Sequence, residues 1–439
     1  MSRSIDKYRF WCETEQKYKY VWDEASPTVC PVDAAHTIDL NSLSIVDGVR
    51  QNATSVINLP KTGFDELRVA ERSLVIELKS IYGKSTLRDV YVEEGTATIT
   101  NNLGDSEFTL KVNDGNDVAW LQSAERGRYV AGLQGEVGIA TRMVDPLVGN
   151  QTLRIGLFDT SNGFYYKYTS NNMYACILRD AIETEIARET WNIDRFDGTG
   201  PSGVTLNPFD GNIYNIRFTW YGYGDIEFRL TTVSGDLIQS SYLGHVYNPF
   251  SQTSVKNPNL PLSVRLDSNG TTATTTAKVA GRQYSLLGKY TPIFRLNAAY
   301  RLSFNVNSLT FIPIMSIRRK IGYLGNSIKA IEADLISGGQ MVIQFRTGTT
   351  LTGASFTTPN DTDPNDTAVE YDTSATAVTG GIPIWTGLIS GESRANVSSS
   401  LQVSHDLTNY ETMTICARLV ANIAGGALIS TTLRWTEEW

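Results

Sequence analysis

The alternation of apolar and polar residues with a period of two constrains this fold more than any other feature of the sequence. In residues 213–230 the side chains expected on one face are Tyr214, Ile216, Phe218 and Trp220, followed by Ile226, Phe228 and Leu230. Successive side chains of a β-strand point to opposite faces, so this pattern predicts half-buried strands. Residues 221–224, Tyr-Gly-Tyr-Gly, form a turn between them, which completes a β-hairpin.

The same pattern recurs along the chain. Further hairpins are expected in residues 96–112 and 164–178, and further strands around 302–306, 340–345, 413–419 and 429–435. Short strands separated by Gly, Asn and Asp turns, without interleaved helices, predict an all-β protein built from β-sandwiches. Helices are expected only in short stretches, such as 65–72 and 328–335.

The length of 439 residues corresponds to roughly two to four domains. We expect a small N-terminal docking segment at 1–60, a β-sandwich at 61–290 and a second, C-terminal β-domain at 291–439. The polar stretch 267–278 is expected to be a long loop or an exposed hairpin tip, and 357–376 a polar insert in the C-terminal domain.

The net charge of −8 and the pI of about 5.1 argue against a surface that neutralises nucleic-acid phosphates. The sequence has no run of 18 apolar residues, so we expect no transmembrane helix and no membrane partner. The first ten residues, MSRSIDKYRF, lack the apolar core of a signal peptide.

The four cysteines form no CxxC pair and are not expected to cluster with histidine, so we expect no zinc site and no cofactor. Cys176 and Cys416 lie in strand-like runs and are expected to be buried. For Cys12 and Cys30 both free thiols and a disulfide remain open. Asp361, Asp363 and Asp366 lie close together in the sequence and are compatible with a calcium site or with a solvated loop. The solvated loop is the favoured interpretation.

No arrangement of catalytic residues is evident. The histidines are only His36, His245 and His405, and no GxSxG, HExxH or P-loop motif is present. Asp194 and Asp197, with Glu183 and Glu185, are the best candidates for the paired carboxylates of a glycosidase. The favoured interpretation is that Asp194 and Asp197 accept backbone N–H groups and hold a Gly-rich turn. We therefore expect no enzyme and keep a glycan depolymerase as a weaker alternative.

An aromatic-rich set of residues suggests a second kind of site. Exposed Tyr and Trp rings stack on sugars, whereas most such rings in sandwiches belong to the core or its rim. Glycan contact remains open as an alternative for Tyr165, Tyr166, Trp220, Tyr221 and Tyr223, with Tyr168 nearby in the sequence.

The block WNIDRFDGTGPSG at 191–203, followed by a strand ending at Trp220 with Gly222 and Gly224, resembles a pattern in virion structural proteins of tailed phages and large DNA viruses. Residues 126–129, 10–15 and 27–31 fit the same pattern, and the resemblance covers mostly residues 8–40 and 95–265. It implies a concanavalin-like jelly roll in a tail, baseplate or capsid fibre. The residues assigned to its structural turn are Trp191, Asp194, Asp197, Gly198, Gly200 and Gly203.

The N-terminal segment is aromatic and partly basic, so it would bury its rings well against another subunit. We expect a docking arm or small anchoring domain whose contact residues are Phe10, Trp11, Tyr18, Tyr20 and Trp22. Its expected partners are other virion structural proteins and further copies of the chain, in a trimer or a higher ring. The expected location is the virion, and a host-receptor protein that binds surface glycans is the alternative.

Overall fold

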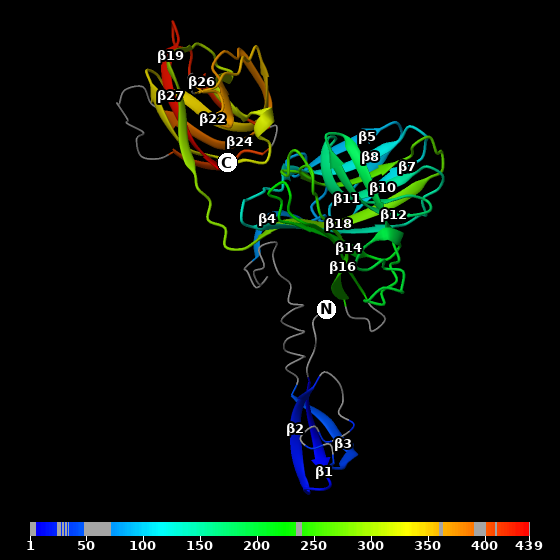
Figure 1. Cartoon of the computed structure of the whole chain (residues 1–439). Helices are drawn as coiled ribbons and strands as arrows, with labels where there is room; N and C mark the ends of the chain where they lie inside the picture. The colour runs from blue at the N-terminus through cyan, green and yellow to red at the C-terminus, as the bar shows by residue number, and fades with distance from the viewer. Residues whose placement is uncertain are drawn as a thin grey trace. The chain divides into compact units, whose positions relative to one another are not determined.

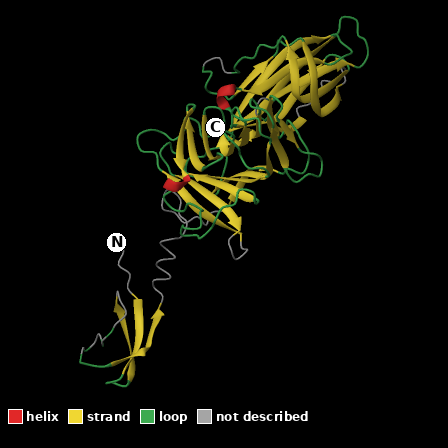
Figure 2. Cartoon of the chain, turned by 90° about the vertical axis from the view of Figure 1, so that its right-hand side faces the viewer, coloured by secondary structure: helices red, strands yellow, loops and turns green. Residues whose placement is uncertain are grey.

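The computed structural model describes residues 6–23, 28, 30, 33, 35–47, 72–233, 239–359, 363–389, 401–408 and 411–438. In these ranges the chain is all-β, as expected, and the helical segments are two short 3-10 turns, η1 (Arg188–Thr190) and η2 (Ile321–Tyr323) (Figure 2). The described part of the chain has no helix that is both long and apolar enough to cross a membrane.

The chain divides into two compact units, Met1–Ala70 and Glu71–Trp439. The first unit contains a three-stranded antiparallel sheet in the order β2-β1-β3. Its strands, labelled in Figure 1, are β1 (Asp6–Cys12), β2 (Lys17–Asp23) and β3 (Ile38–Asp47).

The second unit begins with a sandwich of two large antiparallel sheets (Figure 1). The seven-stranded sheet runs, in spatial order, through β13 (Ile182–Ala187), β12 (Met173–Arg179), β11 (Asn162–Tyr168), β10 (Thr152–Phe158), β17 (Pro261–Asp267), β8 (Val118–Arg126) and β5 (Asp89–Glu94). The eight-stranded sheet runs through β16 (Gln239–Tyr247), β15 (Ile226–Val233), β14 (Asn212–Phe218), β9 (Gln134–Met143), β18 (Thr275–Leu287), β7 (Phe108–Val112) and β6 (Thr98–Thr100), with β4 (Arg72–Leu78) paired to β18. This is the expected jelly-roll type of sandwich.

The core of this sandwich follows from the alternation in the sequence. In β14, Tyr214, Ile216 and Phe218 are buried in the core cluster between the sheets. Two tyrosines from opposite sheets also meet there, since the hydroxyl groups of Tyr168 and Tyr214 are 2.9 Å apart. Full burial of a large apolar side chain stabilises the fold by about 1.5–3 kcal/mol, so the cluster favours one register for each strand.

A smaller second sandwich completes the unit. Its four-stranded sheet is β19 (Arg295–Val306), β27 (Ala427–Glu438), β21 (Ser327–Ser337) and β25 (Leu401–Asp406). Its five-stranded sheet is β23 (Val369–Asp372), β20 (Ile312–Arg319), β26 (Thr412–Leu419), β22 (Met341–Thr352) and β24 (Ala377–Ile389). A separate core cluster that includes Phe345 and Trp435 lies between these sheets.

The helix expected at 328–335 is wrong, because these residues belong to strand β21. The pairing of β21 shifts register between Ala330 and Glu332. This bulge moves the buried positions from Ile328 and Ala330 to Ala333 and Leu335, a spacing that imitates a helical period. The other expected helix, at 65–72, lies outside the described residues except for Arg72, which begins β4.

A buried carboxylate closes two turns of the first sandwich. Asp117, which is 1% exposed, lies just before β8. Its Oδ1 accepts the N–H of Thr96 at 2.6 Å, and its Oδ2 accepts the N–H groups of Asn113 at 2.6 Å and Asp114 at 2.9 Å. Burial alone would raise the pKa of Asp117, but these bonds and the Thr96 hydroxyl lower it from 3.8 to about 2.

We predict that Asp117→Asn lowers the free energy of unfolding by about 2 kcal/mol at neutral pH. This is the free energy by which the folded protein favours the ionised form of Asp117, as its lowered pKa shows. Because the folded pKa lies below the unfolded one, the stabilisation is complete above about pH 4 and is lost as the pH falls towards about 2. Denaturant titrations across this range should show the difference between variant and wild type shrink. Glu94→Gln, at an exposed carboxylate at the end of β5, is the control and should change stability by less than about 0.5 kcal/mol. A loss that does not depend on pH would contradict the assignment.

Candidate functional site

The WNIDRFDGTGPSG block forms a turn that is pinned to strand β16. The indole of Trp191 is buried, and its N–H donates to the carbonyl of Ile186 at 3.1 Å. The side chain of Asn192 makes two 3.0 Å hydrogen bonds with the backbone of Val246, one as donor and one as acceptor. The N–H of Asp194 donates to the carbonyl of Gly244 at 2.9 Å.

The two carboxylates of this block hold backbone groups. Asp194 is buried, and its two oxygens accept the N–H groups of Phe196 at 2.8 Å and Ser202 at 2.7 Å. Asp197 is exposed and accepts the N–H of Thr199 at 2.9 Å. Hydrogen bonds from the hydroxyl and N–H of Thr199 lower the pKa of Asp197. Both carboxylates therefore act as acceptors within the turn, which is the role that the sequence favoured.

Three glycines have separate reasons to be in this turn. Gly198 and Gly203 have φ angles of +85° and +66°, which side chains strongly disfavour. Gly200 is required by space, because a Cβ at this position would lie 2.2 Å from Oδ1 of Asp194.

Glu183 and Glu185, the other carboxylates considered for catalysis, lie in β13 beside Lys167. The ammonium of Lys167 is 2.8 Å from Glu183 Oε2 and 2.5 Å from Glu185 Oε1, and the hydroxyl of Tyr165 donates to Glu183. Burial alone would raise the pKa of Glu183, but Lys167 and Tyr165 lower it. Glu183 is therefore ionised and engaged as an acceptor, which does not suit a general acid.

The aromatic residues proposed for glycan contact fall into two groups. Tyr165 and Tyr166 are both 0% exposed, so the prediction of glycan contact is wrong for them. Trp220 is half-buried and packs against the core, whereas Tyr221 and Tyr223 are 49% and 60% exposed. Period-two reasoning places rings on a face of a strand, but it does not show which rings a neighbouring segment covers.

The exposed rings lie on a tight loop between β14 and β15. Tyr129 contacts this loop: its ring lies edge-on to Trp220 at 5.2 Å and to Tyr221 at 6.3 Å. The loop also bonds to the segment that carries Phe250, since the N–H of Ser254 donates to the carbonyl of Gly222 at 2.9 Å. Phe250 is 91% exposed. We call Tyr129, Tyr221, Tyr223 and Phe250 the aromatic loop cluster.

Sequence reasoning missed two members of this cluster. Tyr129 was noted only as part of the family resemblance. Phe250 follows Asn248 and Pro249, a pair typical of turns, and this was the signal for an exposed ring.

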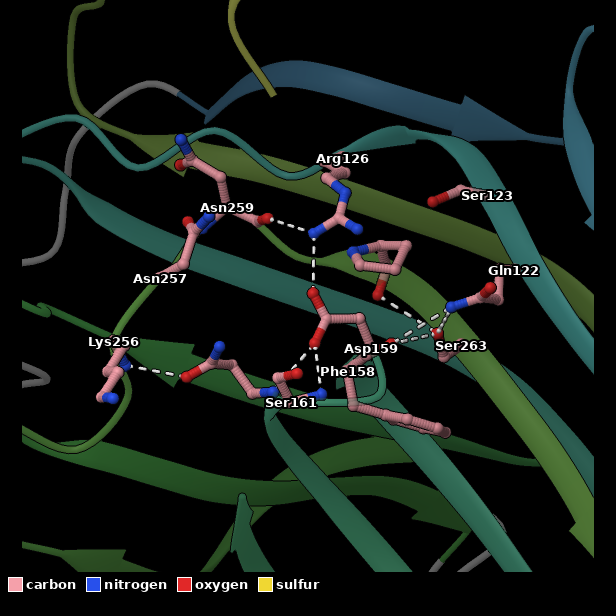
Figure 3. Close-up of polar contacts among 12 residues, drawn as sticks. Gln122, Ser123, Arg126, Phe158, Asp159, Ser161, Lys256, Asn257, Asn259 and Ser263 are labelled. Carbon is pink, nitrogen blue, oxygen red and sulfur yellow. Dashed lines mark hydrogen bonds and ion pairs between the residues drawn. The ribbon is translucent and has the colours of Figure 1, made fainter. Parts of the chain in front are cut away.

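A polar network that includes Arg126, Asp159 and Asn259, drawn in Figure 3, lies next to Tyr129 in the sequence and the fold. Nη1 of Arg126 is 2.8 Å from Oδ2 of Asp159 and donates to the carbonyl of Asn259 at 3.1 Å. The other oxygen of Asp159 accepts the N–H of Ser161 at 2.8 Å. The side-chain oxygen of Asn259 accepts the N–H of Tyr129, also at 2.8 Å. The β10–β11 turn, the end of β8 and the segment before β17 are thereby joined.

A cavity of about 480 Å³ opens beside Tyr129. Two further tyrosines, Tyr290 and Tyr323, line it together with Asn259 and Ile293. Its volume lies in the range of small-ligand sites, and its lining combines aromatic rings with a few polar groups.

The edge strand β19 of the second sandwich, together with the two residues before it, carries several exposed apolar side chains. We define the apolar edge as residues 293–302. Its exposed side chains and their exposed fractions are Ile293 (80%), Phe294 (49%), Leu296 (63%), Tyr300 (65%) and Leu302 (65%). In the described sheet β19 pairs only with β27, so its other edge is open there.

In the N-terminal unit the proposed docking residues have different surroundings. Phe10 is fully buried in the unit's own core, so the prediction that Phe10 contacts a docking partner is wrong. Trp11 is half-buried, and its ring contacts that of Tyr18, which is 50% exposed, at a centroid distance of 5.0 Å. The side chains of Tyr20 and Trp22 lie outside the described residues.

The expectation that cysteine and histidine do not cluster is wrong, because Cys12, Cys30 and His36 converge in the N-terminal unit. Both cysteines are free thiols. In the proposed calcium loop, Asp361 lies outside the described residues, and Asp363 accepts the N–H of Asn365 at 2.8 Å.

Comparisons with known proteins find solved structures that resemble this chain in fold at low sequence identity and low TM-score. No family model matches the sequence, and no curated protein matches it. The lectin-like defense protein arcelin-5 of Phaseolus vulgaris is 8% identical, with a TM-score of 0.31, over 49% of this chain and 99% of its own. The CBM2 module of the evolved Dit of Lactobacillus casei BL23 phage J-1 is 8% identical, with a TM-score of 0.30, over 51% and 99%. A carbohydrate esterase of Shiga toxin-encoding bacteriophage phi24B is 9% identical, with a TM-score of 0.27, over 50% and 100%. At these values no ligand or activity transfers to this chain.

We predict that Gly200→Ala destabilises the first sandwich by at least about 2 kcal/mol, because the added Cβ would displace Asp194 from the two N–H groups it accepts. Gly211→Ala is the matched control, since a Cβ there meets nothing within 4 Å. Denaturant unfolding of both variants measures the difference. Equal stability of the two variants would show that Asp194 does not hold the turn.

Proposed function

We propose that this chain is a non-enzymatic structural protein of a virus particle that acts by self-association and by docking to other virion proteins. The resemblance of the WNIDRFDGTGPSG block to virion structural proteins supports a place for the chain in a virus particle. The observation that carries self-association is the apolar edge.

An open edge strand offers unpaired backbone N–H and C=O groups, which a strand of another chain can complete. Proteins that act alone usually shield such edges with charges, or keep them short. In β19, a strand of 12 residues, the exposed positions include Leu296, Tyr300 and Leu302, and the one exposed charge is Arg295 at the start of the strand. The apolar edge therefore favours burial against a neighbour.

We assign this neighbour to a second copy of the chain. Structural proteins of virus particles stand beside further copies of themselves, and closed symmetric assembly into a trimer or a higher ring covers the same edge on every subunit. Strand addition contributes hydrogen bonds along the edge, and the exposed apolar side chains add burial at about 25 cal/mol per Å².

Docking to other virion proteins is assigned to residues 1–60, which include the Trp11–Tyr18 pair. We predict that a chain without residues 1–60 keeps its two sandwiches and is no longer incorporated into particles. Quantifying the chain in purified particles checks this, and normal incorporation of the truncated chain would exclude the role.

We predict that the purified chain forms a discrete oligomer and that the double variant Leu296→Lys, Tyr300→Lys reduces its mass to that of a smaller species. Two charges on the open edge oppose strand addition, while circular dichroism should remain that of a folded β-protein. Light scattering measures the mass. The control is Leu103→Lys, which places a charge at a residue 83% exposed in the first sandwich and should leave the oligomer intact. An unchanged mass in the double variant would show that the apolar edge does not contribute to the oligomer.

The second candidate function is contact with a host surface glycan. It is favoured by the aromatic loop cluster, where Tyr221, Tyr223 and Phe250 expose their rings from two bonded loops. Exposed rings of this kind stack on the apolar faces of sugars.

We predict for this candidate that Tyr221→Ala with Tyr223→Ala weakens binding to host-surface polysaccharide at least about tenfold, which corresponds to about 1.4 kcal/mol. Calorimetry or a glycan array measures the binding. Tyr82→Ala, at a tyrosine that is 56% exposed and lies outside both the aromatic loop cluster and the apolar edge, is the control and should bind as the wild type does. A wild type that binds no glycan would exclude this function and leave the structural one.

A further inference from the structure

The N-terminal unit brings three metal-ligating side chains to one point. The ligand atoms of Cys12, Cys30 and His36 all lie within 4.8 Å of one another. Cys12 Sγ and His36 Nδ1 are 3.7 Å apart. Cys12 and Cys30 are 0% and 1% exposed, so both thiols face the inside of the unit. In sequence these residues are separated by 17 and five others, a spacing without the CxxC pairs of familiar zinc motifs.

We propose that this cluster binds one Zn²⁺ ion through Cys12 Sγ, Cys30 Sγ and His36 Nδ1. Thiolate and imidazole are ligands that Zn²⁺ prefers, and hard cations such as Ca²⁺ avoid them. With Zn–S near 2.3 Å and Zn–N near 2.0 Å, tetrahedral geometry places ligand atoms roughly 3.5–3.8 Å apart. The 3.7 Å separation of Cys12 Sγ and His36 Nδ1 falls in this range.

The second nitrogen of His36 supports this assignment independently. Nε2 lies 3.5 Å from Oδ2 of Asp33. Histidine ligands of zinc usually donate their other N–H to a carboxylate or carbonyl, which fixes the ring and its tautomer. Asp33 is itself held in the turn, since its Oδ1 accepts the N–H of Ala35 at 2.9 Å and its carbonyl accepts the N–H of His36 at 3.0 Å.

The fourth ligand of the proposed ion lies outside the three clustered side chains. Oε1 of Glu15 lies 3.2 Å from Nδ1 of His36 but does not belong to the group of ligand atoms within 4.8 Å of one another. A tetrahedral zinc ion with three protein ligands takes a carboxylate oxygen or a water molecule as its fourth. Lys17, 2.6 Å from Glu15 Oε2, together with Lys19 holds this carboxylate in place.

Backbone contacts hold two of the three ligands, Cys12 and His36, close to one another. Cys12 is the last residue of β1 and pairs with Ile38, the first residue of β3. The N–H of Glu13 donates to the carbonyl of Thr37 at 3.0 Å, and the N–H of Thr37 donates to Oγ1 of Thr14 at 3.1 Å. The turn after Cys12 and the segment that carries His36 are therefore bound together.

The size of the unit gives the ion a structural role. Its described core contains only Phe10, Cys12 and Cys30, with Ile38 packed against them. Domains with so little apolar burial usually need a metal, a disulfide or a partner to remain folded. Zinc binding would supply this stabilisation, and it does not depend on the function proposed above.

The test is the zinc content of the purified full-length chain, measured by elemental mass spectrometry, together with its titratable thiols after denaturation. We expect one zinc per chain and four reactive thiols, matching the four cysteines of the sequence. Cobalt substitution should give the intense thiolate-to-cobalt absorption of a tetrahedral site. Cys12→Ser, Cys30→Ser and His36→Ala should each lose the metal, whereas Cys176→Ala and Cys416→Ala, which alter thiols of the two sandwiches, should retain it.

Since the ligand variants also risk unfolding the unit, Asp33→Asn provides a milder test. It keeps all three ligands and should weaken zinc binding about ten- to a hundredfold in competition with a chelator. Removing zinc from the wild type should expose residues 1–70 to protease while residues 71–439 stay resistant. Two reactive thiols without zinc, the signature of a Cys12–Cys30 disulfide, would overturn the proposal. A zinc-free chain with four reactive thiols would overturn it as well.

Discussion

Every β-strand has hydrogen-bonding groups along two edges, and the need to satisfy both edges organises this molecule. In the first sandwich the interior strands β10 and β9 have partners on both sides, and their buried faces meet in one core. The outer strands cannot satisfy this requirement within their sheets. Where such a strand also exposes apolar side chains, as β19 does, our proposal is that a strand of another chain completes the edge.

A second constraint is the amount of apolar surface that each part of the chain can bury. The two sandwiches and the N-terminal unit differ in this amount. Each sandwich encloses its own large apolar cluster, and burial of this extent is the main source of stability in domains of this size. The three-stranded sheet of the N-terminal unit has only a minimal described core. Two thiols of this core converge with an imidazole beside it, and a metal ion held there, as we propose, would stabilise the fold of the unit.

Local chemistry in the sequence anticipated some features closely. The hairpin formed by β14 and β15 was predicted from alternation and a Gly-containing turn, and the pairing of Phe218 with Ile226 confirms it. The helix expected at 328–335 failed because a bulge in β21 changes the period of the buried positions. A bulge is a property of strand pairing, so a single strand's sequence carries little sign of it.

The sequence by itself determined the strand pattern, the all-β class and the Gly-rich turn around Asp194, because these follow from the preferences of neighbouring residues. Only the tertiary structure decided which side chains are covered and which distant residues meet. It buried Tyr165 and Tyr166, left Tyr221 and Tyr223 exposed, and brought Cys12 to His36. The physical reason is that burial and long-range proximity depend on how strands far apart in the chain pack together, which alternation along one strand does not encode.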